Sequence, residues 1–285
     1  MEFVPSDPDE SVNLPKQSIL LQVSILLGGV LCVLILFYVS LSLLVETSVE
    51  LLSEKKYTQL QQYMAQRSFF SQGQHSSDLQ SFLDELVEQS PNPNLQLKIY
   101  VSCGPIFNAL AYPDGSIVLF EKLLSNLHSK NELAMVLGHE IGHFIGRDHL
   151  KGLGRSAAAT LISMFLFQSS DTDFSSLLEV GGRLSQNHFS RRQESQADQV
   201  GLEIMYKRFG HVQGYREFFS RLMQESEHEN PIQKSATLSS WFSTHPHSVD
   251  RMELLHQYAQ KSSFSELGNL ESFDVDPKIF CKKDA

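Results

Sequence analysis

The most prominent feature of the hydrophobic pattern is an uncharged apolar run at residues 18–45, rich in Leu, Val and Ile. A helix of roughly 20 apolar residues spans the hydrocarbon core of a bilayer, so this run can cross it with some tilt. The run is too long for the apolar region of a signal peptide, and Cys32 follows Leu31 rather than a small residue, which argues against lipoprotein cleavage. It therefore predicts an uncleaved N-terminal anchor with a single span. The few basic residues on either side leave the side of the membrane open.

After the anchor, apolar positions follow strand spacing in three short segments and helical spacing elsewhere. The strand segments are 95–101, 107–112 and 116–120, the last two around the turn signal Pro113-Asp114-Gly115. Helical spacing, or a start signal for a helix, marks the segments 77–89, 121–127, 129 onward, 187–208, 210–229 and part of 241–258. The pattern therefore predicts an α+β fold that is mostly helical and has a small sheet.

This pattern places one folded domain at residues 77–260. The polar, proline-containing residues 1–17 predict a disordered tail, and residues 46–76 predict a helical linker. Residues 261–285 are polar and predict a loosely ordered tail. The apolar centre of a helical segment at 157–167 is too short to span a bilayer, so it predicts a buried or membrane-skimming helix. Residues 168–176 are polar and predict a loop.

The charge and the cysteines restrict the partners and the type of site. The chain has 23 basic and 33 acidic residues, a net charge of −10. Without a basic stripe, this charge argues against nucleic acid as a partner. The three cysteines, Cys32, Cys103 and Cys281, show no paired spacing. They predict neither a disulfide framework nor a cysteine-based metal site, and they leave the redox compartment open.

The candidate chemistry centres on His139-Glu140-Ile141-Gly142-His143, an H-E-x-x-H motif in a helical segment. Histidines at i and i+4 lie on one helical face and can bind one metal ion, and the intervening Glu140 can take a proton from water. Ser129 and Glu132 resemble a capping box that starts this helix. The small Gly142 leaves room for another element to approach closely.

A peptidase zinc needs a third protein ligand, and two candidates compete for that role. His149 completes the metzincin spacing H-E-x-x-H-x-x-G-x-x-H, but Met164 lies in a helical run rather than in the turn that this pattern requires. Glu194 lies four residues before Asp198, so both carboxylates share one helical face. One can bind metal while the other orients a ligand imidazole, unless both belong to an ordinary solvated face.

Four segments resemble the HtpX-like zinc metallopeptidases, peptidase family forty-eight of the metallopeptidases, which also contains the Ste-type CAAX prenyl proteases and Oma-type mitochondrial quality-control relatives. These segments are Asn108-Ala109 through Val118; His139 to His143 with Arg147; Ser190-Arg191-x-x-Glu194-x-x-Ala197-Asp198-x-x-Gly201; and Thr244-His245-Pro246 with Arg251. H-E-x-x-H alone is unspecific, but its combination with E-x-x-x-D and a late His-Pro is specific. The chain departs from the family in Gln196, where relatives often carry Glu, and in showing one span where some relatives have several.

The resemblance implies a zincin-like domain with one Zn²⁺ per chain and assigns a role to each matching residue. Zinc would be held by His139, His143 and Glu194, with Glu140 as the general base. Asp198 would support a zinc histidine. His245 would stabilise the oxyanion, with Arg251 beside it and His247 as a rival for the same role.

The resulting expectation is a membrane-anchored zinc metalloendopeptidase that hydrolyses peptide bonds in unfolded or flexible proteins. Its partners would be a polypeptide substrate and, through residues 18–45, the lipid bilayer. The strand 116–120, through Ser116, Ile117, Val118 and Leu119, would form a sheet edge to which an extended substrate adds. The alternatives are a metzincin-type protease that uses His149, a prenyl-peptide protease, for which one span is too few, and a non-catalytic zinc-binding membrane adaptor.

Overall fold

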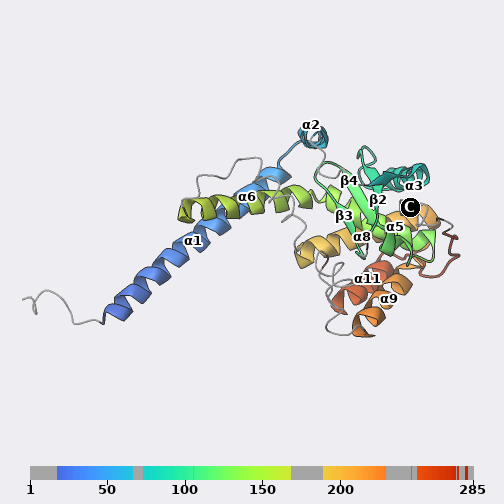
Figure 1. The fold of residues 1–285 in the computed structure, drawn as a ribbon. Helices are drawn as coiled ribbons and strands as arrows, with labels where there is room; N and C mark the ends of the chain where they lie inside the picture. The colour runs from blue at the N-terminus through green and yellow to red at the C-terminus, as the bar shows by residue number, and fades with distance from the viewer. Residues whose placement is uncertain are drawn as a thin grey trace, which may run out of the picture.

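The computed structural model describes residues 18–66, 73–104, 106–167, 189–228, 245, 249–273, 275 and 280–281 of the chain. The tail expected at 1–17 and the loop expected at 168–176 lie outside these residues. The described part is mostly helical with one small mixed sheet, as the sequence predicted, and a long N-terminal helix extends away from the sheet together with a second helix that lies beside it (Figure 1).

The sheet has four strands in the order β1-β2-β4-β3. These strands are β1 Gln74–His75, β2 Lys98–Ser102, β3 Ala109–Ala111 and β4 Ser116–Phe120. β2 and β4 are parallel, whereas β1 and β3 run antiparallel to their neighbours. The three strands that the sequence predicted are present. β1 was missed because two residues are too few to show a periodicity.

β4, the strand expected to receive substrate, is an interior strand of the sheet. Its Ile117 is paired with Ile99 of β2 on one side and with Ala111 of β3 on the other, and all its residues are buried. The edge role expected for Ser116, Ile117, Val118 and Leu119 is therefore wrong. A continuous apolar run is typical of a strand covered on both faces, and here β3 takes the edge position beside the metal-motif helix.

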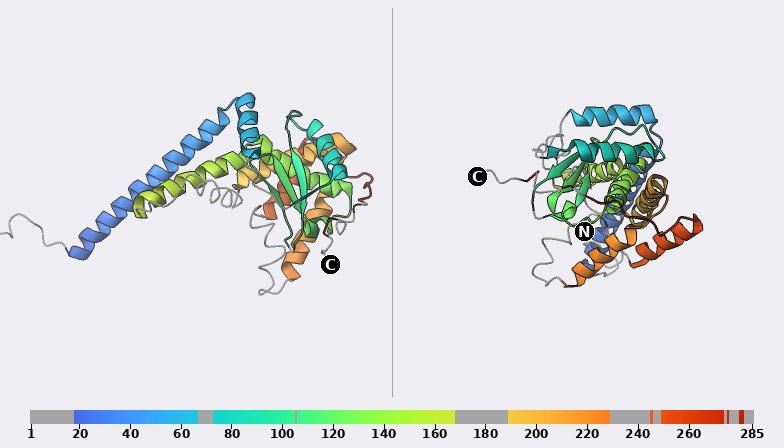
Figure 2. Two further views of the ribbon diagram at one scale, coloured as in Figure 1. Left: turned by 45° about the horizontal axis from the view of Figure 1, so that its top comes forward. Right: turned by 90° about the vertical axis from the view of Figure 1, so that its right-hand side faces the viewer.

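Helices pack around the sheet, whereas α1 (Ile19–Glu50) and α6 (Asp148–Phe167) extend away from it (Figure 2). The described helices are α1 Ile19–Glu50, α2 Glu54–Ala65, α3 Ser77–Glu88, α4 Glu121–Leu124, α5 Lys130–Ile145, α6 Asp148–Phe167, α8 Arg191–Phe209, α9 Tyr215–His228 and α11 Val249–Lys261. The expected cap of α5 is present in part. The Ser129 hydroxyl accepts from the Glu132 N–H, but the Glu132 carboxylate accepts from the His128 N–H rather than from that of Ser129.

Two glycine contacts bring α5 and α8 unusually close together. A Cβ at Gly142 would lie 2.6 Å from the Ala197 Cα, and a Cβ at Gly138 would lie 2.9 Å from the Gly201 Cα. Neither distance is compatible with a side chain, so the backbones approach only because these residues are glycine. This close approach confirms the expectation for Gly142 and places the two helices that carry the candidate ligands side by side.

α6 continues almost directly from α5 and packs along α1 (Figure 1, Figure 2 left). The Lys151 Nζ lies 3.0 Å from a Glu50 carboxylate oxygen, and Leu150 belongs to a small apolar cluster with Val49. Further along, a Cβ at Gly154 would lie 2.2 Å from the Val45 Cγ1. The membrane-anchor candidate is therefore joined to the helix that follows the metal motif.

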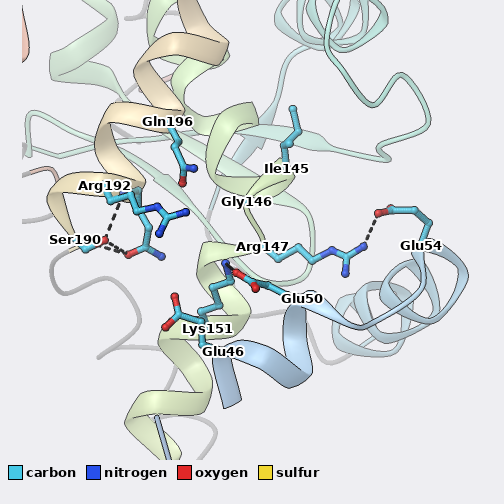
Figure 3. Close-up of a pocket in the computed structure, with 11 residues that line it drawn as sticks. Glu46, Glu50, Glu54, Ile145, Gly146, Arg147, Lys151, Ser190, Arg192 and Gln196 are labelled. Carbon is cyan, nitrogen blue, oxygen red and sulfur yellow. Dashed lines mark hydrogen bonds and ion pairs between the residues drawn. The ribbon is translucent and has the colours of Figure 1, made fainter. Parts of the chain in front are cut away.

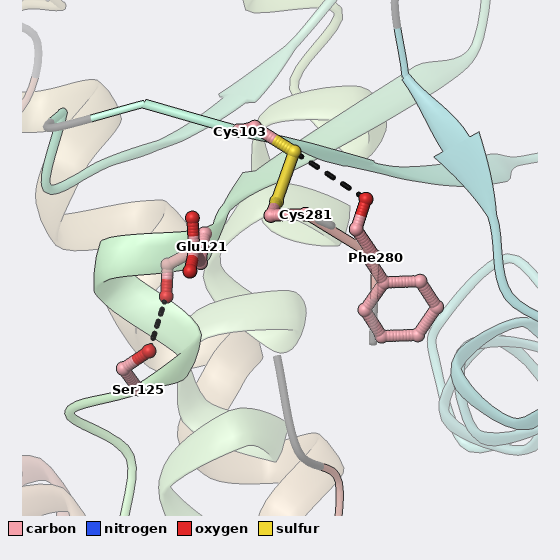
Figure 4. The surroundings of a disulfide bond; sticks show 5 residues. All are labelled: Cys103, Glu121, Ser125, Phe280 and Cys281. Atoms are coloured by element: carbon pink, nitrogen blue, oxygen red, sulfur yellow. Dashed lines mark hydrogen bonds between the residues drawn. A yellow bond between two sulfur atoms is a disulfide. The ribbon is translucent and has the colours of Figure 1, made fainter. Parts of the chain in front are cut away.

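Several described residues after α11 are bonded to the domain, whereas the polar sequence predicted a loosely ordered tail. The Lys130 N–H donates to the Glu271 carbonyl over 2.9 Å, and Ser272 forms a β-bridge with Ser129. Cys281 forms a disulfide with Cys103 (Figure 4). The expectation of no disulfide is thus wrong, because the two cysteines are 178 residues apart in sequence and no local spacing could reveal their contact.

Candidate active site

α5 places the H-E-x-x-H motif in the interior of the domain. His139, Glu140 and His143 are each at most 1% exposed. Leu133 and Leu137 of the same helix are buried in the main core, so the helix is covered around its circumference. A metal bound by these imidazoles would be shielded from bulk water on the side of the helix.

α8 brings the second pair of candidate residues to the same place. The Ser190 hydroxyl caps this helix, and the Gln193 side chain completes a capping box with it. Glu194 and Asp198, one helical turn apart, are 0% and 1% exposed. They therefore do not form a solvated face.

Four side chains converge so that one ligand atom of each lies within 4.8 Å of the others: His139, His143, Glu194 and His245. The His143 Nε2 is 3.1 Å from the His139 Nε2 and 3.3 Å from a Glu194 carboxylate oxygen. The donor set of two imidazoles and one carboxylate, with a further imidazole beside it, suits a divalent transition metal. Close histidines hold the pKa of Glu194 well below its ordinary value although burial alone would raise it.

The Glu140 side chain points toward the same cluster, and one of its two carboxylate oxygens accepts no hydrogen bond from the described residues. The Glu140 Oε1 is buried and has no hydrogen-bond partner among the described residues, and it lies 3.4 Å from the His245 Nε2. Burial raises the pKa of Glu140. A buried, unsatisfied acceptor with a raised pKa suits a group that exchanges a proton with water or substrate.

Asp198 and Arg251 support the cluster from behind. The His139 Nδ1 lies 2.9 Å from an Asp198 carboxylate oxygen. The Arg251 guanidinium donates to both oxygens of Asp198, over 2.7 and 2.8 Å, and lies 2.7 Å from a Glu194 oxygen. Arg251 and His139 hold the pKa of Asp198 below its ordinary value in spite of burial. The structure therefore places Asp198 against His139 and Arg251 against Asp198.

Asp148 and Phe189 also contact the cluster and were missed from the sequence. The His143 Nδ1 lies 2.9 Å from the Asp148 Oδ2, and the Gln193 amide donates to the Asp148 Oδ1 over 2.6 Å. The Phe189 ring stacks on the His143 ring, with centroids 3.9 Å apart. Burial opposes protonation of His143, but hydrogen bonds to Asp148 and Glu194 raise its pKa to about 10. An acidic residue five positions after the second histidine was the signal available for Asp148.

His149, the competing third ligand, lies near the cluster but outside it. It is buried, its ring centroid is 5.9 Å from that of His143, and its Nε2 has no hydrogen-bond partner among the described residues. Burial lowers its pKa to about 3. The group of converging ligand atoms contains Glu194 and does not contain His149.

A comparison with protein-family models gives a match to peptidase family M48 over residues 73–259. The chain belongs to peptidase family M48. The match covers every residue of the cluster, which confirms the resemblance drawn from the four sequence segments. Membership in this family also implies a bound metal, in agreement with the converging donors.

Several named proteins resemble this M48 chain over part of their length. It is 29% identical over 162 residues to the mitochondrial metalloendopeptidase OMA1 of Arabidopsis thaliana, covering 56% of this chain and 31% of that protein. It is 24% identical over 186 residues to the OMA1 protein of Saccharomyces cerevisiae, covering 64% and 53%. It is 27% identical over 215 residues to a protease HtpX homolog of Salinibacter ruber, covering 65% and 75%. The chain thus spans about a third of the length of the first relatives and half or more of others.

Proposed function

We propose that this chain is a zinc metalloendopeptidase anchored in a membrane by α1. The observation that carries the proposal is the buried convergence of His139, His143 and Glu194 with Glu140 beside them. The names of the M48 relatives, which include metalloendopeptidases and a protease, support the same reaction class.

His139, His143 and Glu194 would hold one zinc ion per chain, and the donor set fits it. Two imidazoles and one carboxylate are the ligand set of a catalytic zinc that keeps a position open for water or substrate. When bound there, zinc supplies Lewis-acid polarisation of the scissile carbonyl and lowers the pKa of a coordinated water.

The side chains around the ion would carry the proton transfers and orient the peptide. Glu140 takes a proton from water, which its raised pKa favours, and delivers it to the leaving amine. His245 donates a hydrogen bond to the oxygen that becomes negative when the carbonyl is attacked. Asp198 and Asp148 each fix one ligand imidazole through its Nδ1, and Arg251 holds Asp198 in place.

The substrate would be an extended stretch of polypeptide. β3, not β4, is the edge strand beside α5, since no further strand is paired with its outer edge within the described part of the chain. A peptide added there as a strand would exchange main-chain hydrogen bonds with Ala109–Ala111. This mode of binding favours unfolded or flexible segments over compact domains.

A non-catalytic, closed zinc site is the second candidate, because the converging group has four members rather than three. If His245 is a fourth ligand, no position remains for water. The two functions differ in what His245→Ala does. Loss of an oxyanion donor lowers kcat and leaves zinc bound, whereas loss of a fourth ligand releases zinc.

The test of the proposed function is the hydrolysis of an unfolded protein by full-length Glu140→Gln in detergent. We expect proteolysis to fall about 10²- to 10⁴-fold, the usual contribution of a general acid–base. The zinc content should stay at one ion per chain. Unchanged proteolysis in this variant would refute the mechanism, and proteolysis that is absent in the unmodified chain as well would favour the closed site.

A further inference from the structure

We propose that α6 is a second membrane-embedded element, which enters the bilayer beside α1 from the side of the catalytic domain and ends within it. The partner of α6 would be the hydrocarbon of the bilayer. The proposal rests on the membrane anchor of the proposed function but not on its chemistry.

The first observation is the composition of α6 along its length. Its charged residues, Asp148, Lys151 and Arg155, all lie in the first eight positions. From Ser156 to Phe167 it carries no charge and is mostly apolar. These twelve residues rise about 18 Å, which is more than half of a hydrocarbon core of about 30 Å.

The second observation is that one face of α1 is less exposed than the rest of the helix, along the part that α6 contacts. Nearly all of α1 between Ile19 and Leu44 is exposed, as expected for a helix in lipid. Its less exposed apolar residues lie at Leu34, Leu41, Val45 and Val49, a spacing of seven, four and four that forms one stripe. α6 runs along this part of α1 (Figure 1, Figure 2 left). The stripe extends about 22 Å from Val49 to Leu34.

The contact between Gly154 and Val45 sets the two helices in register. Val45 is the last residue of the uncharged run, and Glu46 follows it. A Cβ at Gly154 would collide with the Val45 side chain, so the helices touch at this level. Everything in α6 beyond Arg155 is therefore placed beside the uncharged part of α1. Arg155 itself can extend its guanidinium to the membrane surface.

Charged groups gather on the domain side of that contact. A cavity of about 340 Å³ lies there between the end of α1, the start of α6 and the start of α8 (Figure 3). Its lining includes Glu46, Glu50, Glu54, Arg147, Lys151 and Arg192. A polar boundary followed by two uncharged helical segments, up to Val45 in α1 and from Ser156 in α6, is the arrangement expected at a membrane surface.

The length of the uncharged part of α1 limits how deeply α6 can enter the hydrocarbon core. The uncharged run of α1 measures about 42 Å, roughly 12 Å more than the hydrocarbon core. The end of α6, at Phe167, lies about 20 Å beyond the level of Gly154 and Val45. If the extra 12 Å of α1 all lie outside the core on the domain side, α6 enters the core by about 8 Å. If none of them do, α6 enters it by about 20 Å. In either case α6 enters the bilayer without crossing it.

The position of α6 also holds the metal centre near the membrane. Asp148, which fixes His143, is the first residue of α6 and lies six residues, or about 9 Å, before Gly154. The active site would therefore face polypeptide segments close to the membrane surface.

Fluorescence quenching in liposomes tests the proposal on the full chain. In a Trp241→Phe background, which removes the single tryptophan of the sequence, one tryptophan is introduced by Ile162→Trp in α6. Leu36→Trp in α1 serves as the lipid-facing control, and Leu254→Trp, at a position 49% exposed on the catalytic domain, as the water-facing control. The liposomes are phosphatidylcholine with or without bromine on the acyl chains.

We expect bromine to reduce the emission of the Ile162→Trp chain at least twofold, as for Leu36→Trp, while Leu254→Trp is unaffected. Emission from Ile162→Trp that is as insensitive as that of Leu254→Trp would overturn the proposal. If circular dichroism shows that Ile162→Trp does not fold, Thr160→Trp on the same helix provides the same test. The result is independent of catalysis, so failure of the proposed peptidase activity would not imitate it.

Discussion

Removal of Arg251 should destabilise the fold and weaken zinc binding. The contacts of its guanidinium indicate how large the loss of unfolding free energy should be. The guanidinium makes three interactions of 2.7–2.8 Å with Glu194 and Asp198, and the residue is only 5% exposed. Arg251→Met keeps much of the volume but leaves the buried carboxylates of Glu194 and Asp198 without the cation that pairs with both. Breaking a buried ion pair on one side typically costs about 3–5 kcal/mol.

The effect on zinc should add to this loss of stability. Without Arg251, Asp198 is no longer held against the His139 Nδ1. Because Glu194 also loses its ion pair with Arg251, protonation of its carboxylate would compete with metal binding. Loss of such supporting partners typically weakens metal affinity about 10- to 100-fold. That change corresponds to about 1.4–2.7 kcal/mol of binding free energy.

The assay is urea unfolding of the full chain in detergent, together with zinc titration against a competing chelator. Arg221→Met is the matched control. Arg221 also pairs with a buried carboxylate, that of Glu132, over 2.6 Å, but at the far end of α5. This control should lose stability and keep its zinc affinity. Equal zinc affinities for Arg251→Met and the unmodified chain would refute the assigned role of Arg251.

Gly142→Ala forces a Cβ into Ala197, so we expect a loss of about 1–3 kcal/mol in unfolding free energy together with a lower zinc content; normal values for both would contradict the close helix contact. Cys281→Ser opens a link across 178 residues and should lower the unfolding free energy by about 5 kcal/mol in the oxidised protein, but not in the reduced one. Asp148→Asn should weaken zinc binding about 10- to 100-fold in chelator competition, and an unchanged affinity would show that His143 does not depend on it.

Local sequence signals predicted the parts of the site that lie on single helices. His139 and His143, and likewise Glu194 and Asp198, are one helical turn apart, so each pair could be recognised from its spacing alone. Gly142 signalled a close approach, and the structure shows that its partner is Ala197. Spacing alone left the choice between Glu194 and His149 open, and the family resemblance favoured Glu194. The contact of α5 with α8 brings Glu194 into the group of converging ligand atoms, which does not contain His149.

The features missed from the sequence depend on contacts between distant segments. The apolar run of β4 predicts a strand but not its neighbours, so its interior position between β2 and β3 was not visible. The contact of Cys103 with Cys281 joins opposite ends of the domain sequence. The polar residues after α11 resemble a free tail, yet their main chain pairs with the start of α5.

The most direct test of the site is the zinc content of the full chain, with Glu194→Ala compared with His149→Ala. Both residues are buried beside His143, so the two variants are matched in location and differ in the proposed role. We predict that Glu194→Ala loses the ion whereas His149→Ala keeps one ion per chain. The reverse pattern would contradict the assignment of the third ligand to α8, and with it the roles given to Asp198 and Arg251.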